Sequence, residues 1–442
     1  MFTKIEEGFR WIESYTNLEK KADQLKRFYR LDRMFMLLEF FNNPQNSYKS
    51  VHLAGSKGKG STAVLIAAAL RENGFKTGLF TSPHLLCYQE RIRVNQEILD
   101  DQEYLNQINR IYRTLNDEKA PIQLPGGDDP TTFELLTLLG FLVFEDQGCD
   151  WAVIETGLGG RLDATNTVIP AVSLITPIEK EHTLWLGDTL EKIAAEKAGI
   201  IKEGVPIITA SQKPAVMEVL KRAAQHKHSA FIQAEEIFKI ENIFLNTEGT
   251  HGSLHSDQGE DLSISLKMIG SIQLNNAGLA LLGLRQALPD VNRDVWIKGF
   301  AKAILPGRMQ LLRESPLLIV DGAHTPNSLR LAMGDFLTLT VPSEENVLLF
   351  ACGDDKNAAE MAAIAATSFS HILITVPGFF KKSHPQRVLK AFEEKHKNVQ
   401  FIETPALALD YIRDNYSDLA VLVAGSFFLA GEIIKSYGES ND

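Results

Sequence analysis

The sequence contains few cysteines and no long apolar run. Its three cysteines, Cys87, Cys149 and Cys352, are too few and too widely separated for a disulfide framework or for a metal site with the usual ligand spacing, and we interpret them as reduced thiols. No stretch of about 18 apolar residues occurs, and the charged, amphipathic N-terminus lacks the apolar core of a signal peptide. We therefore expect a cytoplasmic chain that does not span a membrane.

Basic residues are outnumbered by acidic ones. The 442 residues include 45 Lys and Arg against 56 Asp and Glu, which gives a formal net charge of −11. Such a field repels polyphosphate backbones, so we do not expect nucleic acid as the main partner. We expect small-molecule partners, no membrane partner and a monomeric chain. Hydrophobic residues make up 44% and charged residues 23%, as in ordinary globular proteins, and the length predicts two or three domains of about 150 residues each.

Apolar, β-rich runs alternate with helical patterns along the chain, which predicts parallel sheets covered by helices. The first series of runs covers residues 51–55, 77–80, 151–155, 172–176 and 205–209. The second series covers residues 317–321, 347–352, 371–376, 399–403 and 419–425. The breaker sequence Leu305-Pro306-Gly307 lies between them and predicts two α/β domains, 1–303 and 304–442. Residues 246–261, rich in Gly, Ser, His and Asp, predict a solvated hairpin or loop within the first domain.

A glycine-rich segment, GSKGKGST, follows the first apolar run and precedes a helical pattern from about Lys59. In a strand–loop–helix context, glycines let backbone N–H groups converge on phosphate oxygens, Lys59 can reach the β and γ phosphates, and the Ser61 hydroxyl can bind Mg²⁺. The match to the standard phosphate loop is imperfect, because Leu53 replaces its first glycine and Gly60 separates the lysine from the hydroxyl residue. The segment predicts ATP or GTP binding; an ordinary turn is the alternative.

This segment resembles the GTNGKGST loop of the folylpolyglutamate and dihydrofolate synthases, a branch of the Mur ligase superfamily, and the resemblance covers most of the chain. Further blocks in the family's order are Leu31–Leu38 with Asn43-Pro44-Gln45, Thr81–Leu85, Glu90-Arg91-Ile92, Glu155–Asn166, Glu196–Lys202, Leu305–Arg308 and Asp321–His324. Only 54 residues precede Gly55, too few for the nucleotide-sugar domain of the peptidoglycan ligases. The resemblance implies a phosphate-loop, parallel-sheet ATPase domain followed by a smaller Rossmann-like α/β ligase domain.

The resemblance also implies roles for individual residues. ATP would be bound by Gly55, Gly58, Lys59, Gly60, Ser61, Asn276, Arg308 and Asp321. Two Mg²⁺ ions would be held by Ser61, Ser82, Glu155 and His182. The catalytic residues would be Lys59, His182, Lys197 and Arg308. The pterin-bearing acid would contact Thr131, Thr132, Phe133, Glu134, Leu162, Asp163 and Ala164, and His324 would position the incoming glutamate or the nucleotide.

The residue patterns support some of these roles and leave alternatives for others. Glu155 ends a buried apolar strand, where open α/β sheets bind ligands and where a carboxylate is unfavourable without a cation. His182 can instead be a satisfied, partly buried histidine, Phe133 plain core, and Arg308 a structural ion pair. Thr325 is expected to cap a helix begun by Pro326.

Lys197 is unusual because the spacing of Leu190, Ile193, Ala194 and Ile201 places it on the apolar face of a predicted helix, for which Asp188 and Glu191 suit a capping box. In related ligases the lysine at this place is carbamylated. A buried, neutral amine can react with carbon dioxide, so the resemblance implies a carbamylated Lys197 that helps to organise Mg²⁺.

Four positions depart from the family pattern: Lys57, Glu181, Ile272 and Thr325. They leave the phosphate-transfer residues intact but place the identity of the substrate in doubt. The expected reaction is ATP-dependent ligation of L-glutamate to a folate or dihydropteroate carboxylate through an acyl phosphate. The alternatives are a Mur-type ligase for another carboxylate, a nucleotide-driven switch, and a non-catalytic nucleotide-binding homologue.

Overall fold

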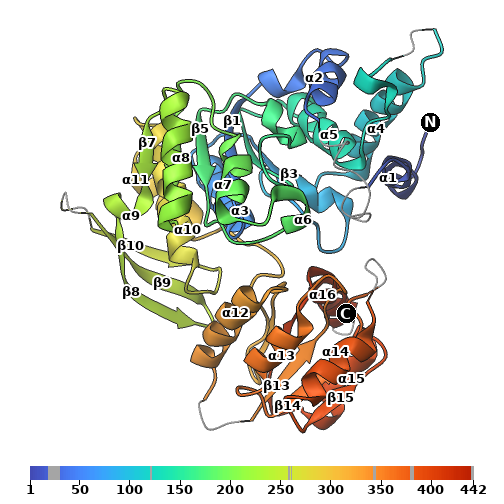
Figure 1. Ribbon diagram of the computed structural model, residues 1–442, viewed down its shortest axis with the longest axis vertical. Coiled ribbons are helices and arrows are strands. Elements are labelled where there is room, and N and C mark those ends of the chain that lie inside the picture. The colour runs from blue at the N-terminus through green and yellow to red at the C-terminus, as the bar shows by residue number, and fades with distance from the viewer. Residues whose placement is uncertain are drawn as a thin grey trace. The chain divides into compact units, whose positions relative to one another are not determined.

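The computed structural model describes residues 1–17, 30–119, 122–256, 259, 261–341, 345–378 and 383–439. Internal contacts divide the chain into two compact units (Figure 1). Unit 1 comprises residues 1–241, 253–264 and 274–303, and unit 2 comprises residues 242–252, 265–273 and 304–442. None of the described helices is both long and apolar enough to cross a membrane.

Unit 1 contains a seven-stranded sheet whose strands, in spatial order, are β3 (Ile92–Val94), β2 (Thr77–Phe80), β4 (Trp151–Glu155), β1 (Lys49–Ala54), β5 (Val172–Ile175), β6 (Ile207–Thr209) and β7 (Phe231–Gln233). Neighbouring strands pair in parallel except β3, which is antiparallel to β2. The central strands are buried on both faces, which explains their continuous apolar sequences. The carboxyl ends of β2, β4, β1 and β5 therefore meet at one edge of the sheet.

Helices cover both faces of this sheet. They are α1 (Ile5–Ser14), α2 (Asp32–Glu39), α3 (Lys59–Glu72), α4 (Asp101–Leu115), α5 (Thr132–Asp146), α6 (Thr183–Leu186), α7 (Leu190–Ala198), α8 (Pro214–His226), α9 (Ala234–Ile237), α10 (Gln273–Ala287) and α11 (Arg293–Phe300). Short 3₁₀ turns are η2 (Pro44–Asn46), η3 (Tyr88–Arg91), η4 (Pro125–Gly127) and η5 (Ala164–Thr167). One core cluster joins α1, α2, α4 and α5 to β2 and β3, and a second joins α7 and α8 to β5 and β6.

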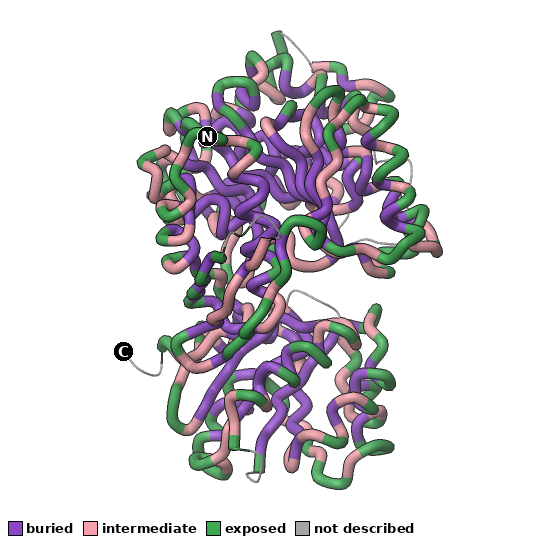
Figure 2. The backbone as a smooth tube through the Cα atoms, turned by 90° about the vertical axis from the view of Figure 1, so that its left-hand side faces the viewer, coloured by how far each residue is buried: buried purple, intermediate pink, exposed green. Residues whose placement is uncertain are grey.

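Unit 2 contains a six-stranded sheet in the order β11 (Gln310–Arg313), β12 (Leu318–Val320), β16 (Ala420–Ala424), β13 (Asn346–Phe350), β14 (His371–Ile374) and β15 (Val399–Phe401). Only the edge pair β11 and β12 is antiparallel. The helices are α12 (Pro326–Leu339), α13 (Ala358–Ala365), α14 (Pro385–Glu393), α15 (Pro405–Asn415) and α16 (Phe427–Glu439). Figure 2 shows buried segments within each unit, and separate clusters of buried apolar residues give each unit a core of its own.

All ten apolar runs coincide with parallel strands, and the α/β fold class is confirmed. Residues 246–261 were expected to be a hairpin or loop within the first domain. The structure has a short turn between β8 (Lys239–Asn246) and its neighbour β9 (Gly249–His255), and with β10 (Asp261–Leu266) these strands form a three-stranded sheet. The assignment to the first domain differs in part, since residues 242–252 group with unit 2. Residues 257, 258 and 260 lie outside the described residues. In β10 the exposed positions carry polar and charged side chains that alternate with buried apolar ones, so this strand has no continuous apolar run.

Candidate active site

The glycine-rich segment forms a tight loop between β1 and α3. Gly55 has a φ of 147° and Gly58 a φ of 84°, backbone conformations that glycine adopts readily. A β-carbon on Gly55 would lie 1.8 Å from Thr176 Oγ1, and one on Gly58 would lie 2.5 Å from Asn276 Oδ1. The loop is fixed to the chain after β5, because Ser56 N and Lys57 N donate to Pro177 O at 2.9 and 3.2 Å. The first turn of α3, which begins at Lys59, presents N–H groups suited to an anion.

Replacing Gly58 with alanine is expected to weaken ATP binding at least tenfold, because the added methyl group must displace the Asn276 side chain. The positive φ of this residue adds a backbone strain of about 1 kcal/mol. Gly74→Ala is a matched control, since Gly74 has the same φ of 84° with no atom within 4 Å of an added β-carbon. Calorimetric titration with ATP measures both variants. Equal affinities for the two variants would contradict a role of the Gly58–Asn276 contact in nucleotide binding.

Lys59 and Glu155 lie together at the ligand edge of the sheet. Lys59 Nζ donates to Gly55 O at 3.1 Å and lies 3.8 Å from Glu155 Oε1. Glu155 is only 4% exposed, and its Oε2 accepts a hydrogen bond from Ser82 N at 3.2 Å. Ser61, in the first turn of α3, is also buried. The structure thus brings Lys59, Glu155 and Ser82 together from the ends of β1, β4 and β2.

The oxygen-rich side chains at this edge fit a hard cation such as Mg²⁺, which prefers carboxylate and hydroxyl oxygens. Glu155 is a buried carboxylate whose nearby cation, Lys59, belongs to the phosphate loop. Within the described residues there is no group of three or more His, Cys, Asp and Glu side chains that could hold a metal ion. An ion here would therefore depend on hydroxyls, water and phosphate oxygens in addition to Glu155. His182 has a φ of 46° and is the N-cap residue of α6, directly after Glu181.

Lys197 is buried, as the helical spacing predicted. The residue is 1% exposed, and its Nζ donates to Gly55 O at 2.7 Å and to Glu181 Oε1 at 2.8 Å. Burial lowers the pKa of Lys197 to about 8, although Glu181 acts in the opposite direction. For Glu181, burial alone would raise the pKa, but Lys197 and Lys59 outweigh it and lower the pKa to about 2. Two lysines, Lys59 and Lys197, therefore converge on one carbonyl oxygen of the phosphate loop.

The predicted cap of this helix is wrong. Thr189 rather than Asp188 is the N-cap of α7, and its side chain accepts from Lys192 N at 3.3 Å. Asp188 instead pairs with the Lys192 side chain at 2.8 Å. Both residue types favour caps, so the sequence did not distinguish them.

The segment after β4 is held by its own acidic residue. Asp163 is 3% exposed; its Oδ2 accepts from Leu158 N at 2.8 Å, and its Oδ1 accepts from Thr165 N at 3.0 Å and Thr165 Oγ1 at 2.5 Å. His52 Nε2 lies 2.9 Å from the same hydroxyl. Burial raises the pKa of Asp163, and these hydrogen bonds act to lower it. Asp163 thus shapes the loop that carries Leu162 and Ala164, and its carboxylate already has internal partners.

The predicted acid-substrate residues of α5 also have internal partners. Thr131 caps the helix reciprocally with Glu134, and Thr132 Oγ1 donates to Tyr15 O at 3.1 Å. The Glu134 carboxylate forms a buried, two-pronged ion pair with Arg33, with Nε–Oε2 and Nη2–Oε1 distances of 2.9 Å. Phe133 packs against Phe80, with ring centroids 6.1 Å apart. A β-carbon on Gly157 would lie 2.3 Å from the Phe133 ring, so this ring reaches the loop that follows β4.

Glu134→Gln is expected to lower the free energy of unfolding by about 3 kcal/mol, because it leaves the buried Arg33 guanidinium without its carboxylate. Chemical denaturation measures this loss. Adding Arg33→Met removes the uncompensated charge and should restore part of the stability. An unchanged stability in Glu134→Gln would show that the pair contributes little to folding.

Unit 2 gathers a separate group of predicted residues at the end of β12. Asp321 accepts hydrogen bonds from Met309 N at 2.8 Å and Ala323 N at 2.7 Å. It therefore fixes the residue that follows Arg308 and the residue that precedes His324. The Arg308 guanidinium lies 3.9 Å above the Phe427 ring, and the His324 ring lies 5.4 Å from it. Thr325 caps α12, which begins at Pro326, as expected.

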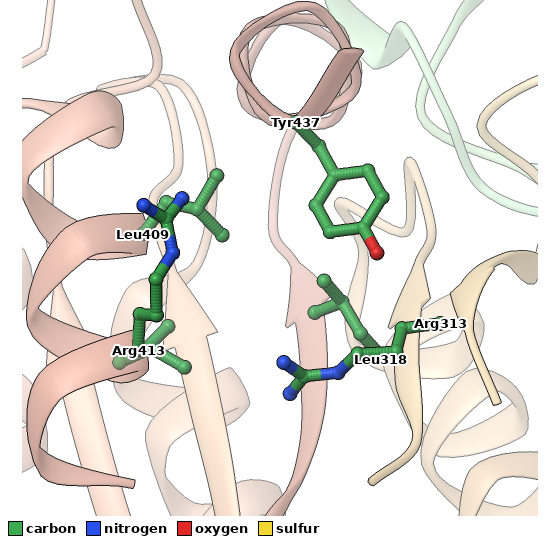
Figure 3. A pocket seen from close by; sticks show the side chains of 6 residues that line it. Arg313, Leu318, Leu409, Arg413 and Tyr437 are labelled. Carbon is green, nitrogen blue, oxygen red and sulfur yellow. The ribbon is translucent and has the colours of Figure 1, made fainter. Parts of the chain in front are cut away.

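Two contacts were not found from the sequence. Phe427 contacts both Arg308 and His324. The available signal was its place at the start of a helix, just after the Gly425-Ser426 pair that follows a buried strand. The Glu181–Lys197 ion pair was also missed, although Glu181 was recognised as unusual. A small pocket in unit 2, lined by Arg313, Leu318, Leu409, Ile412, Arg413 and Tyr437, contains none of the predicted site residues (Figure 3).

Comparison with known proteins supports the same interpretation. The family models described as Mur ligase middle domain and Mur ligase, glutamate ligase domain match residues 53–283 and 307–427. The dihydrofolate synthase/folylpolyglutamate synthase of Bacillus subtilis is 30% identical over 98% of this chain and 99% of its own length. The crystal structure of the Thermotoga maritima folylpolyglutamate synthase is 29% identical, with a TM-score of 0.84 over 99% of this chain and 97% of that one.

A structure of E. coli FolC in complex with DHPP and ADP is 26% identical to this chain. It covers 100% of this chain and 99% of its own, with a TM-score of 0.85. The agreement therefore extends over both units and includes a relative that binds a nucleotide. The chain belongs to the folylpolyglutamate synthase and dihydrofolate synthase family of the Mur ligases.

Proposed function

We propose that this protein is an ATP-dependent ligase that joins L-glutamate to the carboxylate of a folate or of dihydropteroate. The observation that carries the proposal is the convergence of Lys59 and Lys197 on the carbonyl of Gly55, beside the buried Glu155. A lysine cation and a carboxylate at a phosphate loop suit transfer of the γ-phosphate, because they act where charge develops. Lys197 is buried beside them, where its lowered pKa suits carbamylation. The nucleotide-bound relative supports the use of ATP.

The proposed reaction has two steps. A carboxylate oxygen of the acid attacks the γ-phosphorus of ATP, the bond to the β-phosphate oxygen breaks, and ADP leaves, which forms an acyl phosphate. The amine of L-glutamate then attacks the acyl carbon, and phosphate departs with the oxygen that had attacked; the amine loses a proton. Phosphorylation is required because the oxide of a free carboxylate is a very poor leaving group.

In this proposal the residues of the chain bind and orient the reactants. Gly55, Gly58, Gly60, Ser61 and Lys59 hold the phosphates, and Lys59 offsets the charge that develops on the transferred group. We assign the ATP-binding domain to residues 1–303 and the ligase domain to residues 304–442, with residues 242–252 and 265–273 making their contacts within unit 2. The remaining nucleotide contacts are assigned to Asn276, Arg308 and Asp321, and the glutamate or nucleotide contact to His324.

Two Mg²⁺ ions are proposed, held by Ser61, Ser82, Glu155 and His182; when bound they neutralise phosphate charge and favour its transfer. The contacts to the acid are assigned to Thr131, Thr132, Phe133, Glu134, Leu162, Asp163 and Ala164. Among these, Phe133 and Leu162 are partly exposed whereas the others are buried, so these two are assigned the direct contacts. The Glu134 carboxylate pairs with Arg33, and the Asp163 carboxylate accepts hydrogen bonds from Thr165. In this proposal these two carboxylates do not contact the acid directly but fix the conformation of the segments that do.

The test is a coupled assay of ADP formation. We expect ADP release that requires both L-glutamate and a pterin acid, with a corresponding mass gain in the acid. Dihydropteroate and reduced folates are tested in parallel, because Lys57, Glu181, Ile272 and Thr325 depart from the family pattern. ATP turnover that is indifferent to both substrates would reject the proposal, and release of ADP with another carboxylic acid would assign a different Mur-type substrate.

A further inference from the structure

Arg93 lies in the middle of the short edge strand β3, between Ile92 and Val94. Both neighbours are buried and belong to the core cluster that contains α5. Because successive side chains of a strand point to opposite faces, Arg93 lies on the other face of the sheet. A charged side chain on a strand of a covered sheet needs a partner or a route to water.

The part of the chain that the structure describes provides no hydrogen-bond or ion-pair partner for Arg93. Its Nε is shielded from solvent and donates no hydrogen bond, and Arg93 forms no hydrogen bond or ion pair with any residue that the structure describes. Two buried arginines of the same unit differ from it, since Arg33 pairs with Glu134 and Arg91 Nε donates to His84 Nδ1 at 2.8 Å. A shielded, charged N–H group without an acceptor is unfavourable, so the acceptor is expected from outside the chain.

The strand register places Arg93 on the same face of the sheet as Glu155. Arg93 is opposite Leu79, and Leu79 is opposite Val153 on the next strand, two residues before Glu155. Paired residues, and residues two apart on one strand, share a face. In the order β3, β2, β4, β1, Arg93 lies on β3, Glu155 ends β4, and β1 leads into the phosphate loop. Glu155 therefore lies between Arg93 and the phosphate loop.

The nearest carboxylates are already engaged with other groups. Glu90 accepts hydrogen bonds from Leu85 N and Leu86 N at 2.7 Å and from Cys87 N at 2.9 Å. Glu155 accepts from Ser82 N and faces Lys59. Burial lowers the pKa of Arg93, while Glu90, Tyr104 and Glu155 act to raise it. These carboxylates are thus close enough to attract Arg93 but do not contact it.

We propose that Arg93 binds an anionic group of the acid substrate, on the side of Glu155 away from the phosphate loop. The inference rests on the proposed function, in which the reacting acid must lie beside the γ-phosphate. The nucleotide phosphates have Lys59 and the first-turn amides of α3, whereas Arg93 is the cation placed beyond Glu155. The planar fork of a guanidinium matches a carboxylate through two parallel hydrogen bonds.

The experiment compares Arg93→Met, which removes the charge at similar length, with Arg93→Lys, which keeps the charge but loses the fork. Arg71→Met is the control, because Arg71 is an exposed arginine that pairs with Glu97. Each variant is assayed for the KM of the pterin acid and of ATP. Binding of the acid is also measured by calorimetry with a non-hydrolysable ATP analogue and Mg²⁺ present. Melting temperatures verify that the variants are folded.

For Arg93→Met we expect the KM and the dissociation constant of the acid to rise by about 10- to 100-fold, with the KM of ATP changed less than about twofold. Arg93→Lys should lie between this variant and the wild type. Unchanged acid binding in Arg93→Met would overturn the inference, and so would a rise confined to the KM of ATP. A wild-type protein that neither binds nor consumes the acid would reject the proposed function itself. This result is distinct from failure of the Arg93 inference, which requires a wild type that binds the acid and an Arg93→Met variant that binds it equally well.

Discussion

Replacing Lys59 with methionine is expected to reduce the rate of ADP formation by about 1,000-fold while leaving the fold intact. Lys59 Nζ lies at the phosphate loop, donates to Gly55 O and is 3.8 Å from Glu155. A preorganised cation that stabilises charge developing on a transferred phosphoryl group typically changes the rate by about 100- to 1,000-fold. Methionine keeps most of the length and apolar volume of the side chain, so the main change is the loss of charge. Single-turnover measurement of ADP formation at saturating ATP tests this effect.

The matched control for Lys59→Met is Lys302→Met. Lys302 is exposed and pairs with Glu72 in the last turn of α3, at 2.7 Å. This exposed pair is expected to contribute less than about 1 kcal/mol to stability, and its removal should leave the rate unchanged. A Lys59→Met variant with a rate within about tenfold of the wild type would show that the loop lysine does not stabilise the transferred phosphate.

Replacing Lys197 with methionine is expected to lower the rate of ADP formation at least about 100-fold. In the native protein, the fraction of carbamylated Lys197 should increase with pH. Only the neutral amine reacts with carbon dioxide. Burial lowers the pKa of Lys197 to about 8, so the neutral fraction, and with it the carbamate, rises as the pH passes through 8 rather than near 10. Activity in carbon dioxide-free buffer should therefore be low and should recover with added bicarbonate.

Glu181 provides the internal test of this prediction. Its ion pair with Lys197 favours the ammonium, so Glu181→Gln should lower the pKa of Lys197 further and increase the carbamylated fraction at neutral pH. Intact-mass analysis under conditions that preserve the adduct measures that fraction, and Lys192→Met, at an exposed lysine of the same helix, is the control. A bare ammonium at Lys197 under bicarbonate, in both the wild type and Glu181→Gln, would contradict carbamylation.

The sequence predicted the parts of the fold that local patterns determine. Buried parallel strands such as Trp151–Glu155 have continuous apolar sequences, and the glycine loop before Lys59 has its own composition, so both could be located. The antiparallel edge strands β3 and β11 are short and depend on distant partners, which local patterns do not reveal. Residues 246–261 were predicted to be a hairpin or loop because Gly, Ser, His and Asp dominate them, although β9 lies there.

The candidate site was predicted where a residue follows a strand or lies on a helix face. Glu155 and Lys197 were found in this way, since strand ends and helical spacing fix their positions. The partners of these residues were not found, because contacts such as Lys197–Glu181, Glu134–Arg33 and Arg308–Phe427 join segments whose approach depends on the whole fold. Sequence patterns thus indicated the chemistry, and the structure supplied the contacts that orient it.

The most direct test of the proposed chemistry follows one oxygen atom. If the pterin acid is labelled with oxygen-18 in the carboxylate that reacts, an acyl phosphate requires that one labelled oxygen leave with the phosphate when glutamate attacks. Mass spectrometry of the released inorganic phosphate should therefore show one oxygen-18 per amide bond formed, with unlabelled ADP. Unlabelled phosphate, or label in AMP, would contradict activation of the acid by the γ-phosphate.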